Sequence, residues 1–215
     1  MTRPARLVFV AGTGTEVGKT WVSAQLLGRA RAAGHTVAAR KPLQSFSPGD
    51  TRTDSVVLGE ATGEPPSAVC PERYSYPAPM APPMAGAALS QKVPAQAELV
   101  AGISASWPDR CDIGLVEGAG GVASPLTADA DGVAVARALG PDVVVLVTDA
   151  ALGVINLVRL SLAALAPLPV IVHLNRFHPV DDLHRRNRDW LVDHDRFEVT
   201  TSIPDLLAKI ISARP

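Results

Sequence analysis

Residues 7–20 read LVFVAGTGTEVGKT, and this stretch decides the fold. Its first part, Leu7–Val10, is a short run of apolar, mostly β-prone residues, which is typical of a strand buried on both faces. From Val17 to about Ala33 the apolar residues recur at helical spacing, and Gly34 follows as a helix-terminating residue. The sequence therefore predicts a buried strand, a glycine-rich turn and a helix, in that order.

The turn from Gly12 to Thr20 has the features of a phosphate-binding loop. Glycines let several backbone N–H groups surround phosphate oxygens, and the start of the following helix adds the positive end of its dipole. In such loops the lysine, here Lys19, reaches the β- and γ-phosphates, and the Thr20 hydroxyl ligates Mg²⁺. The common spacing puts the first glycine at residue 13, but here that residue is Thr13 and the glycine precedes it. We expect this segment to bind a nucleoside triphosphate with Mg²⁺.

Strands and helices alternate along the rest of the chain. We expect strands at 36–39, 113–116, 143–147 and 169–174, helices at 52–62, 95–107, 153–164 and 180–192, and a last strand before a short helix from residue 205. This alternation predicts an α/β fold: a single P-loop NTPase-like domain over residues 1–215, with a mostly parallel sheet and helices on both faces. The proline- and alanine-rich segment 64–88 is expected to cross the surface as a folded loop, anchored by Tyr74, Tyr76, Met80 and Met84.

Composition excludes several classes of function. A net charge of −1 and few aromatic residues argue against nucleic acid as a partner. No apolar stretch is long enough for a signal peptide or a membrane span, so we expect a cytoplasmic protein without a membrane partner. Cys70 and Cys111 are far apart in the sequence and belong to no CxxC pair, which favours buried thiols.

Three charged residues outside the loop are candidates for phosphoryl chemistry. Glu117 follows the strand at 113–116 and precedes several glycines, so it should lie at the carboxyl edge of the sheet, where open α/β sheets bind ligands. Asp54 either ligates the metal or caps the helix that begins there. Lys41 follows the second strand and is either a cation facing the central crevice or a solvated surface lysine.

Taken together, these motifs resemble those of the dethiobiotin synthetases of biotin biosynthesis. The resemblance runs in order across nearly the whole chain, and its most specific part is the form Gly-Thr-x-Thr-x-Val-Gly-Lys-Thr, which accounts for the unusual glycine spacing. The matching segments are Gly12–Thr20, Lys41-Pro42 with Ser45, Asp54, Pro79–Pro82, Val116–Gly121, Leu152–Asn156 and Asn175.

The resemblance implies a role for each matching residue. Lys19, Lys41 and Thr15 would be catalytic. The metal ligands would be Thr20, Asp54 and Glu117. The nucleotide would contact Gly14, Glu16, Val17, Gly18, Lys19, Thr20, Trp21, Asp54, Glu117, Gly118, Ala119, Gly120, Asn175, Arg176 and Pro204. The small substrate would contact Thr15, Lys41 and Ser45, and Gly153, Val154, Ile155 and Asn156 would hold its far carboxylate across a homodimer interface.

The resemblance also implies a reaction. Members of this family are ligases that close the ureido ring of dethiobiotin from 7,8-diaminononanoate and CO₂ or bicarbonate, with Mg²⁺ and with ATP as co-substrate. A carbamate and then a carbamic–phosphoric anhydride would form, and the two lysines would neutralise them. This is catalysis by positioning and electrostatics, without a protein nucleophile.

The sequence departs from the family pattern at a few positions, and two other readings stay open. Phe46 stands where glycine is usual, Pro83 where histidine is frequent, and the aspartate common after Asn175-Arg176 is absent. These departures leave the small substrate and the nucleotide, ATP or another triphosphate, open. One alternative is a related P-loop ligase acting on another acid or amine. The other is a partition-type ATPase switch, which would usually carry an additional lysine early in the loop.

Overall fold

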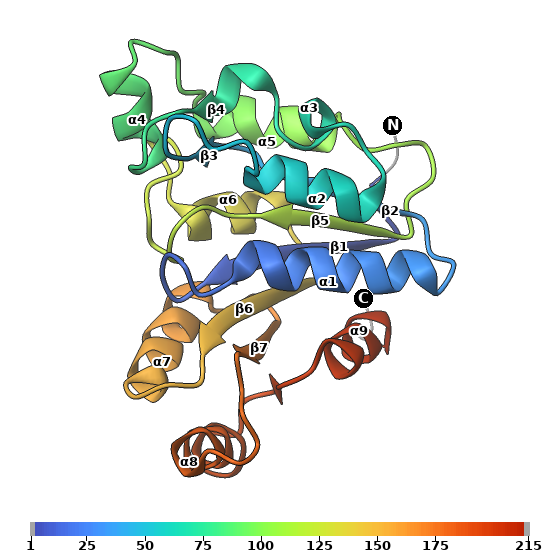
Figure 1. The fold of residues 1–215 in the computed structure, drawn as a ribbon, viewed down its shortest axis with the longest axis vertical. Coiled ribbons are helices and arrows are strands. Elements are labelled where there is room, and N and C mark those ends of the chain that lie inside the picture. The colour runs from blue at the N-terminus through green and yellow to red at the C-terminus, as the bar shows by residue number, and fades with distance from the viewer. Residues whose placement is uncertain (1–2, 213–215) are drawn as a thin grey trace.

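A parallel sheet of six strands forms the centre of the computed structural model, which describes residues 3–212. The strand order is β2-β5-β1-β6-β7-β8, and every neighbouring pair is parallel (Figure 1). The elements follow one another as β1 (Arg6–Gly12), α1 (Lys19–Ala32), β2 (Val37–Arg40), β3 (Gln44–Ser45), α2 (Asp54–Thr62), α3 (Pro66–Val69), η1 (Glu72–Tyr74), β4 (Ser75–Tyr76), α4 (Pro82–Ala88), α5 (Gln96–Ser104), β5 (Ile113–Glu117), α6 (Gly132–Leu139), β6 (Val143–Asp149), α7 (Val154–Leu165), β7 (Val170–Asn175), α8 (Asp182–Asp189), η2 (Trp190–His194), β8 (Val199–Thr200) and α9 (Ile203–Ser212).

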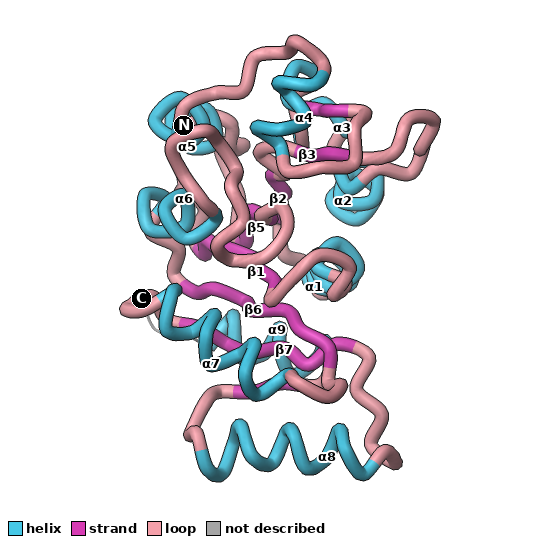
Figure 2. Tube along the Cα trace, turned by 90° about the vertical axis from the view of Figure 1, so that its left-hand side faces the viewer, coloured by secondary structure: helices cyan, strands magenta, loops and turns pink. Residues whose placement is uncertain are grey.

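Both faces of the sheet are covered, as the apolar strands predicted. Side chains alternate along β1, so Phe9 packs into a core shared with α5, α6 and α7, whereas Val8 and Val10 pack into a second core with α1, α2 and α9. Figure 2 shows α5, α6 and α7 on one side of the sheet and α1 and α2 on the other. Each fully buried Leu, Val or Phe contributes about 1.5–3 kcal/mol, so neither layer is dispensable.

The parallel arrangement gathers the ends of three neighbouring strands. β2, β5 and β1 are adjacent in the sheet and end at Arg40, Glu117 and Gly12. Because parallel strands all point the same way, the residues that follow them meet at one edge. This edge carries the candidate site.

The sequence missed or misplaced several elements. α1 begins at Lys19 rather than Val17, because Gly18 has a left-handed φ of +92° that interrupts the helical geometry. α6 was not predicted, and neither was the two-stranded parallel sheet of β3 and β4. α9 begins at Ile203. The expected domain over 1–215 extends at both ends beyond the described residues.

The proline-rich segment is more structured than a loop. It contains α3, η1, β4 and the whole of α4, and prolines stand in the first turns of both helices, where the missing N–H has no cost. Tyr74 and Tyr76 are buried anchors, as expected. Met80 and Met84 are exposed, so the expectation that they anchor the segment is wrong. Cys70 and Cys111 are buried free thiols, as predicted.

Candidate active site

The unusual glycine spacing of the loop has a packing reason. A Cβ on Gly12 would lie 3.0 Å from three atoms of the loop itself, among them Lys19 Cδ. A glycine is therefore needed at the end of β1 so that the loop can fold back over it. Thr13, at the position where glycine is common, donates its hydroxyl to Thr148 Oγ1 of β6 at 2.9 Å. This threonine therefore links the loop to the neighbouring strand β6 through a side-chain hydrogen bond.

A second glycine is required at the start of α1. A Cβ on Gly18 would lie 2.2 Å from Asn175 Nδ2, and its φ of +92° disfavours other residues. Asn175, at the end of β7, donates this amide to Val17 O at 3.0 Å and is itself buried. Asn175, at the end of β7, therefore holds the end of the loop, at Val17 and Gly18, in position.

The Lys19 ammonium is held inside the loop. Nζ donates to Gly14 O at 2.9 Å and to Gly120 O at 2.8 Å, so it joins the loop to the glycine run after β5. Burial, together with the nearby Lys41 ammonium, lowers the pKa of Lys19 to about 8. An anion bound between the two lysines would stabilise both ammonium groups and raise the pKa of Lys19 again.

Next to the loop, two carboxylates converge on one hydroxyl and one ammonium. Thr20 Oγ1 lies 2.8 Å from Asp54 Oδ1 and 2.7 Å from Glu117 Oε1. Lys41 Nζ lies 2.7 Å from Asp54 Oδ2 and 2.8 Å from Glu117 Oε1. A hydroxyl has a single proton and can donate to only one of the two acids, so the Lys41 ammonium is the counterion that holds them together.

The alternatives left open by the sequence are decided by these contacts. Lys41 is buried, so it is not a solvated surface lysine. The residue that precedes α2 is Thr53, and the Asp54 side chain turns to Thr20 and Lys41 instead of capping the helix. Glu117 is fully buried at the end of β5, where the sheet-edge argument placed it.

The electrostatics of the cluster follow from burial and pairing. Burial lowers the pKa of Lys41, but the Glu117 and Asp54 carboxylates more than offset it and hold this pKa above its ordinary value. Burial raises the pKa of Asp54, yet the Lys41 charge and the hydrogen bonds from Lys41 and Thr20 bring it below its ordinary value. Lys41 and Asp54 are therefore both charged at neutral pH.

Sequence reasoning missed Ser23. Its Oγ donates to Glu117 Oε2 at 2.6 Å, and its side chain is completely buried. Ser23 stands three residues after Thr20, so both hydroxyls lie on the same face of α1, and this helical spacing was the available signal. The hydrogen bond engages Oε2 of Glu117, so the other carboxylate oxygen, Oε1, faces Thr20 and Lys41.

Replacing Ser23 by alanine should weaken the cluster without unfolding the protein. The buried Oε2 of Glu117 would lose its donor, which costs about 1–3 kcal/mol because the acceptor is charged. We expect a lower Tm and a higher magnesium concentration for half-maximal activity, measured by calorimetry and magnesium titration. Ser23→Thr keeps a hydroxyl at this position, so its half-maximal Mg²⁺ concentration should lie closer to that of the wild type. An unchanged magnesium dependence in Ser23→Ala would contradict the positioning role.

A cleft of about 820 Å³ opens beside this cluster. The sequence-predicted residues that line it are Thr15, Glu16, Gly18, Lys19, Thr20, Trp21, Lys41, Ser45, Asp54, Ala119, Gly120 and Arg176. Residues 79–82 and Ser124 also line it. Ser45 Oγ is buried and has no hydrogen-bond partner among the described residues, so a polar group in the cleft could engage it.

Other predicted residues lie outside the lining of this cleft. They include Gly14 and Val17 of the loop, and also Glu117 and Gly118, whose O accepts from Lys41 Nζ at 3.0 Å. Phe46 and Pro83 are likewise not lining residues. Neither Asn175 nor the exposed Pro204 lines the cleft, so their contact with a nucleobase stays a prediction.

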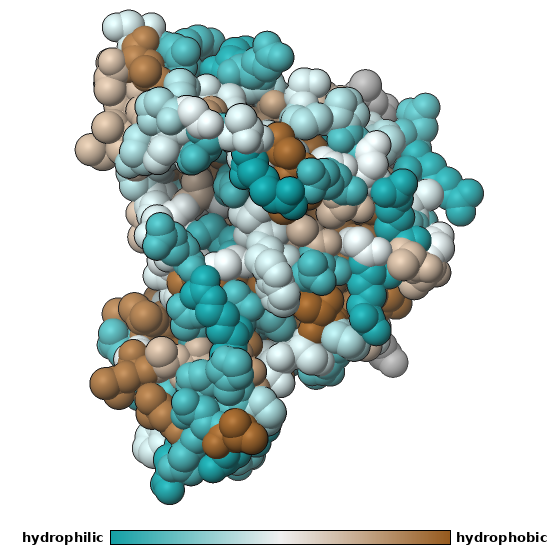
Figure 3. Space-filling view, viewed as in Figure 1, coloured by the Kyte–Doolittle hydropathy of each residue, from teal (hydrophilic) through white to brown (hydrophobic). Residues whose placement is uncertain are grey.

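The segment expected to receive a carboxylate, residues 153–156, does not line the cleft of this single chain either. It begins α7, where Gly153 has a left-handed φ of +93°. Leu152, just before the helix, and Leu157 and Leu160 within it are exposed, and Figure 3 shows hydrophobic side chains gathered over this part of the molecule, at the lower left. Its role also stays a prediction.

Nucleotide affinity should depend on the protonation of Lys19. Because the pKa of Lys19 lies near 8 in the free protein, the ammonium is lost as the pH rises through this value. A bound phosphate would stabilise the charged form, so affinity should fall by up to about tenfold per pH unit above the free-state pKa. A fluorescent-nucleotide titration between neutral and alkaline pH measures this. Lys19→Arg should give a flat profile, and a flat wild-type profile would contradict the prediction.

Comparison with known proteins identifies the family of this chain. A model described as an AAA domain matches residues 6–204. The ATP-dependent dethiobiotin synthetase of Anaeromyxobacter dehalogenans (strain 2CP-C) is 41% identical over 183 residues, covering 82% of this chain and 79% of the relative. That of Xanthomonas oryzae pv. oryzae (strain PXO99A) is 37% identical over 162 residues, covering 74% and 71%. This chain belongs to the dethiobiotin synthetase family. The predicted resemblance is confirmed.

Solved structures with low sequence identity share the fold of this dethiobiotin synthetase family member. A plasmid partition protein from Borrelia burgdorferi B31, solved with AMPPNP bound, superimposes with a TM-score of 0.55 at 16% identity, covering 97% of this chain and 89% of that one. The signal recognition particle receptor FtsY of Elizabethkingia anophelis gives a TM-score of 0.55 at 14% identity, covering 99% and 66%. They confirm the P-loop NTPase-like fold and carry no further argument.

Within the part of the chain that the structure describes, no helix combines the length and the apolar character needed to cross a membrane.

Proposed function

We propose that this protein is an ATP-dependent dethiobiotin synthetase. It would close the ureido ring of dethiobiotin from 7,8-diaminononanoate, CO₂ and ATP in the presence of Mg²⁺. The names of its relatives support the reaction class. The observation that carries the proposal is the pairing of two buried lysines, Lys19 and Lys41, beside one cleft that also holds Thr20 and Asp54.

The residues at this edge fit a magnesium ion. Mg²⁺ prefers oxygen ligands and keeps several positions for water and phosphate oxygens. The Thr20 hydroxyl lies within hydrogen-bond distance of the two carboxylates of Asp54 and Glu117. These residues would hold the metal, which would supply positive charge to the nucleotide phosphates when bound. With the carboxylates neutralised in this way, Lys41 would be free to donate to an anionic substrate.

The steps of the reaction follow from where the charges lie. One substrate amine adds to the carbon of CO₂ and releases a proton to solvent, which leaves a carbamate whose negative charge would sit between Lys19 and Lys41. A carbamate oxygen attacks the γ-phosphorus, ADP leaves, and a carbamic–phosphoric anhydride forms. The second amine then attacks the carbamoyl carbon, the C–O bond to phosphate breaks, and that amine loses its proton. Both lysines stabilise the anions without forming a bond to them.

The protein's remaining contacts would position the two substrates. Ser45 Oγ, which is buried and has no hydrogen-bond partner within residues 3–212, is suited to bond an amine or carbamate group. Thr15 lines the same cleft from the phosphate loop. We assign the triphosphate to the loop and α1 N-terminus, because free N–H groups at a helix start favour anions. Asn175, Arg176 and Pro204 are proposed on the nucleobase side.

We also propose that the active form is a homodimer. The exposed leucines Leu152, Leu157 and Leu160 lie around the first turns of α7, with exposed fractions of 85%, 43% and 64%. Such a cluster is favourable at an interface and costly in water. Pairing through α7 would bring residues 153–156 of one chain toward the substrate of the other, where the helix N-terminus could bind a carboxylate.

Replacing Leu160 by glutamate should break this dimer. A charge in the apolar centre of an interface would be desolvated without a partner, so the dimer should dissociate at concentrations where the wild type is paired. Sedimentation velocity measures the change, and the KM for the diamine should rise in parallel. Leu183→Glu, on exposed α8, is the matched control and should leave both unchanged. A Leu160→Glu variant that sediments as the wild type does would contradict the α7 interface.

The function is tested with purified protein, 7,8-diaminononanoate, ¹³C-bicarbonate, Mg²⁺ and ATP. We expect dethiobiotin carrying one ¹³C, identified by mass spectrometry, together with equal amounts of ADP and phosphate. Omission of the diamine should suppress ADP release. Absence of product with ATP and with every other nucleoside triphosphate would contradict the proposal.

A further inference from the structure

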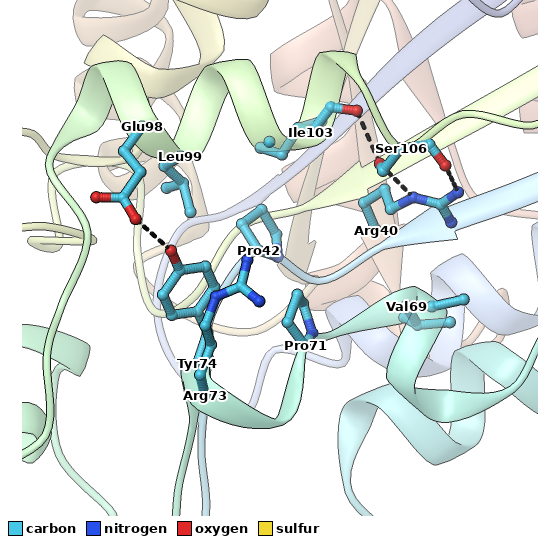
Figure 4. Close-up of a pocket in the computed structure, with 12 residues that line it drawn as sticks. Arg40, Pro42, Val69, Pro71, Arg73, Tyr74, Glu98, Leu99, Ile103 and Ser106 are labelled. Carbon is cyan, nitrogen blue, oxygen red and sulfur yellow. Dashed lines mark hydrogen bonds between the residues drawn. The ribbon is translucent and has the colours of Figure 1, made fainter. Parts of the chain in front are cut away.

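A second cavity lies apart from the active-site cleft. It has a volume of about 320 Å³ and lies between α5 on one side and the α3–η1 segment on the other (Figure 4). It shares no lining residue with the cleft. The lining residues are Arg40, Pro42, Ala68, Val69, Pro71, Arg73, Tyr74, Glu98, Leu99, Gly102, Ile103 and Ser106.

The walls of this cavity are apolar. Leu99 and Ile103 reach down from α5, and Val69, Pro71 and Pro42 face them (Figure 4). Small-molecule pockets of about 300–1,000 Å³ are built in this way, with a mostly apolar lining and a few polar groups that fix orientation. The cavity is at the lower end of that range, so it suits a narrow ligand.

The inner end of the cavity needs no polar ligand. Arg40 is buried there, and its guanidinium pairs with Glu64 at 2.8 Å, donates to Ser106 and stacks over the Trp107 ring at 4.9 Å. Its polar contacts are therefore made within the protein. A ligand that reaches this end gains most by presenting apolar surface.

The outer end offers an unpaired cation. Arg73 lies over the Tyr74 ring at 4.7 Å, with its guanidinium extending toward Pro42 (Figure 4), and it forms no ion pair within residues 3–212. Glu98 lines the same cavity, where its charge also attracts Arg73, and it accepts hydrogen bonds from Tyr74 Oη and Lys92 Nζ, each at 2.8 Å. Because Lys92 and Glu98 neutralise each other, the remaining charge at this end is the positive charge of Arg73. A guanidinium favours a carboxylate as its partner.

One residue of α5 keeps the cavity open. Residues 98, 99, 102 and 103 lie on the face of α5 that lines the cavity, because they are spaced one turn apart, and Ser106 follows the helix. Gly102 is an exposed residue in the last turn of this helix, and a Cβ built on it would meet no atom within 4 Å. No close approach of backbone requires glycine here, so its effect is to leave volume unfilled.

We propose that this cavity is a second small-molecule site, which binds an aliphatic monocarboxylate. The apolar chain lies between α5 and the α3–η1 segment with its end toward Arg40. The carboxylate lies at the outer end against Arg73. The site is independent of the catalytic cleft, and its occupancy does not require the proposed function.

Octanoate is a suitable probe, titrated by calorimetry into the full-length protein saturated with Mg²⁺ and a non-hydrolysable ATP analogue. We expect saturable binding of one equivalent at low-millimolar concentration or below. Gly102→Leu, which fills the cavity, should weaken binding at least about tenfold without lowering Tm. Arg73→Gln should weaken octanoate about five- to tenfold but leave 1-octanol unaffected, since only the charge contact is lost.

Arg52→Gln is the matched control, because Arg52 is an exposed arginine that pairs with Glu60 outside the cavity. It should bind octanoate as the wild type does. Absence of saturable binding to the wild type would overturn the proposal. Binding that persists unchanged in Gly102→Leu would also overturn it, because octanoate would then occupy another site, such as the catalytic cleft. Neither result bears on whether dethiobiotin is formed.

Discussion

Replacing Lys41 by methionine should lower kcat for ring closure by at least about 10²–10³-fold, the cost of removing a preorganised charge contact in a buried site. Methionine keeps much of the volume but removes the ammonium that lies 2.7 Å from Asp54 and 2.8 Å from Glu117. Steady-state assays at saturating diamine and Mg-ATP measure the loss. Nucleotide binding should persist, because the loop and Lys19 are unchanged.

The same substitution should destabilise the metal-free protein by about 3–5 kcal/mol, since it leaves a buried carboxylate without its counterion. Magnesium should restore part of this stability, because a divalent cation can take over the role of the ammonium. Thermal unfolding with and without Mg²⁺ measures both effects. Lys209→Met removes a partly exposed ion pair with Glu198 and should change neither activity nor magnesium response. A Lys41→Met enzyme of normal kcat would contradict the catalytic assignment.

Replacing Glu117 by glutamine should raise the Mg²⁺ concentration needed for half-maximal activity at least about 100-fold. Loss of an outer-shell partner alone costs up to about this factor in metal affinity. The amide keeps the shape of the side chain but lacks the charge that meets Thr20 and Lys41 at Oε1. Activity titrated against Mg²⁺ at fixed ATP measures the shift. Without this carboxylate the pKa of Lys41 should also move back toward its ordinary value.

Glu60→Gln is the matched control for that experiment. Glu60 forms an exposed ion pair with Arg52 far from the phosphate loop in sequence, and exposed pairs contribute about 0–1 kcal/mol. Its magnesium dependence should equal that of the wild type. If Glu117→Gln and Glu60→Gln give the same magnesium curve, Glu117 does not hold the metal.

The sequence predicted the scaffold because buried parallel strands have a simple pattern. The runs at β1, β5, β6 and β7 are continuous and apolar, and helices with glycine ends separate them. From the strand ends alone, Glu117 and Lys41 could be expected at the same edge. α6 was missed because it follows an irregular glycine-containing turn, and β3 and β4 are only two residues each, too short for any periodicity.

The finer features of the site depend on contacts between segments far apart in sequence. Ser23 looks like an ordinary helix residue until its bond to Glu117, 94 residues away, is known. Gly18 is explained by Asn175, whose amide would lie 2.2 Å from a Cβ. For Gly18 the reason lies in the distant Asn175, and for Ser23 the spacing from Thr20 did not by itself identify the partner. The Gly12 spacing was visible in the sequence, but its cause, the loop folding back over the strand end, was not.

The central claim is that a substrate-derived carbamate accepts the γ-phosphoryl group between Lys19 and Lys41. Brief incubation of the enzyme with ¹⁸O-bicarbonate, diaminononanoate, Mg²⁺ and ATP in unlabelled water tests it most directly. Because one carbamate oxygen becomes the bridge to phosphorus and leaves with it, the account predicts one ¹⁸O in the released phosphate and one in the ureido carbonyl. Phosphate free of ¹⁸O, formed together with labelled dethiobiotin, would contradict it.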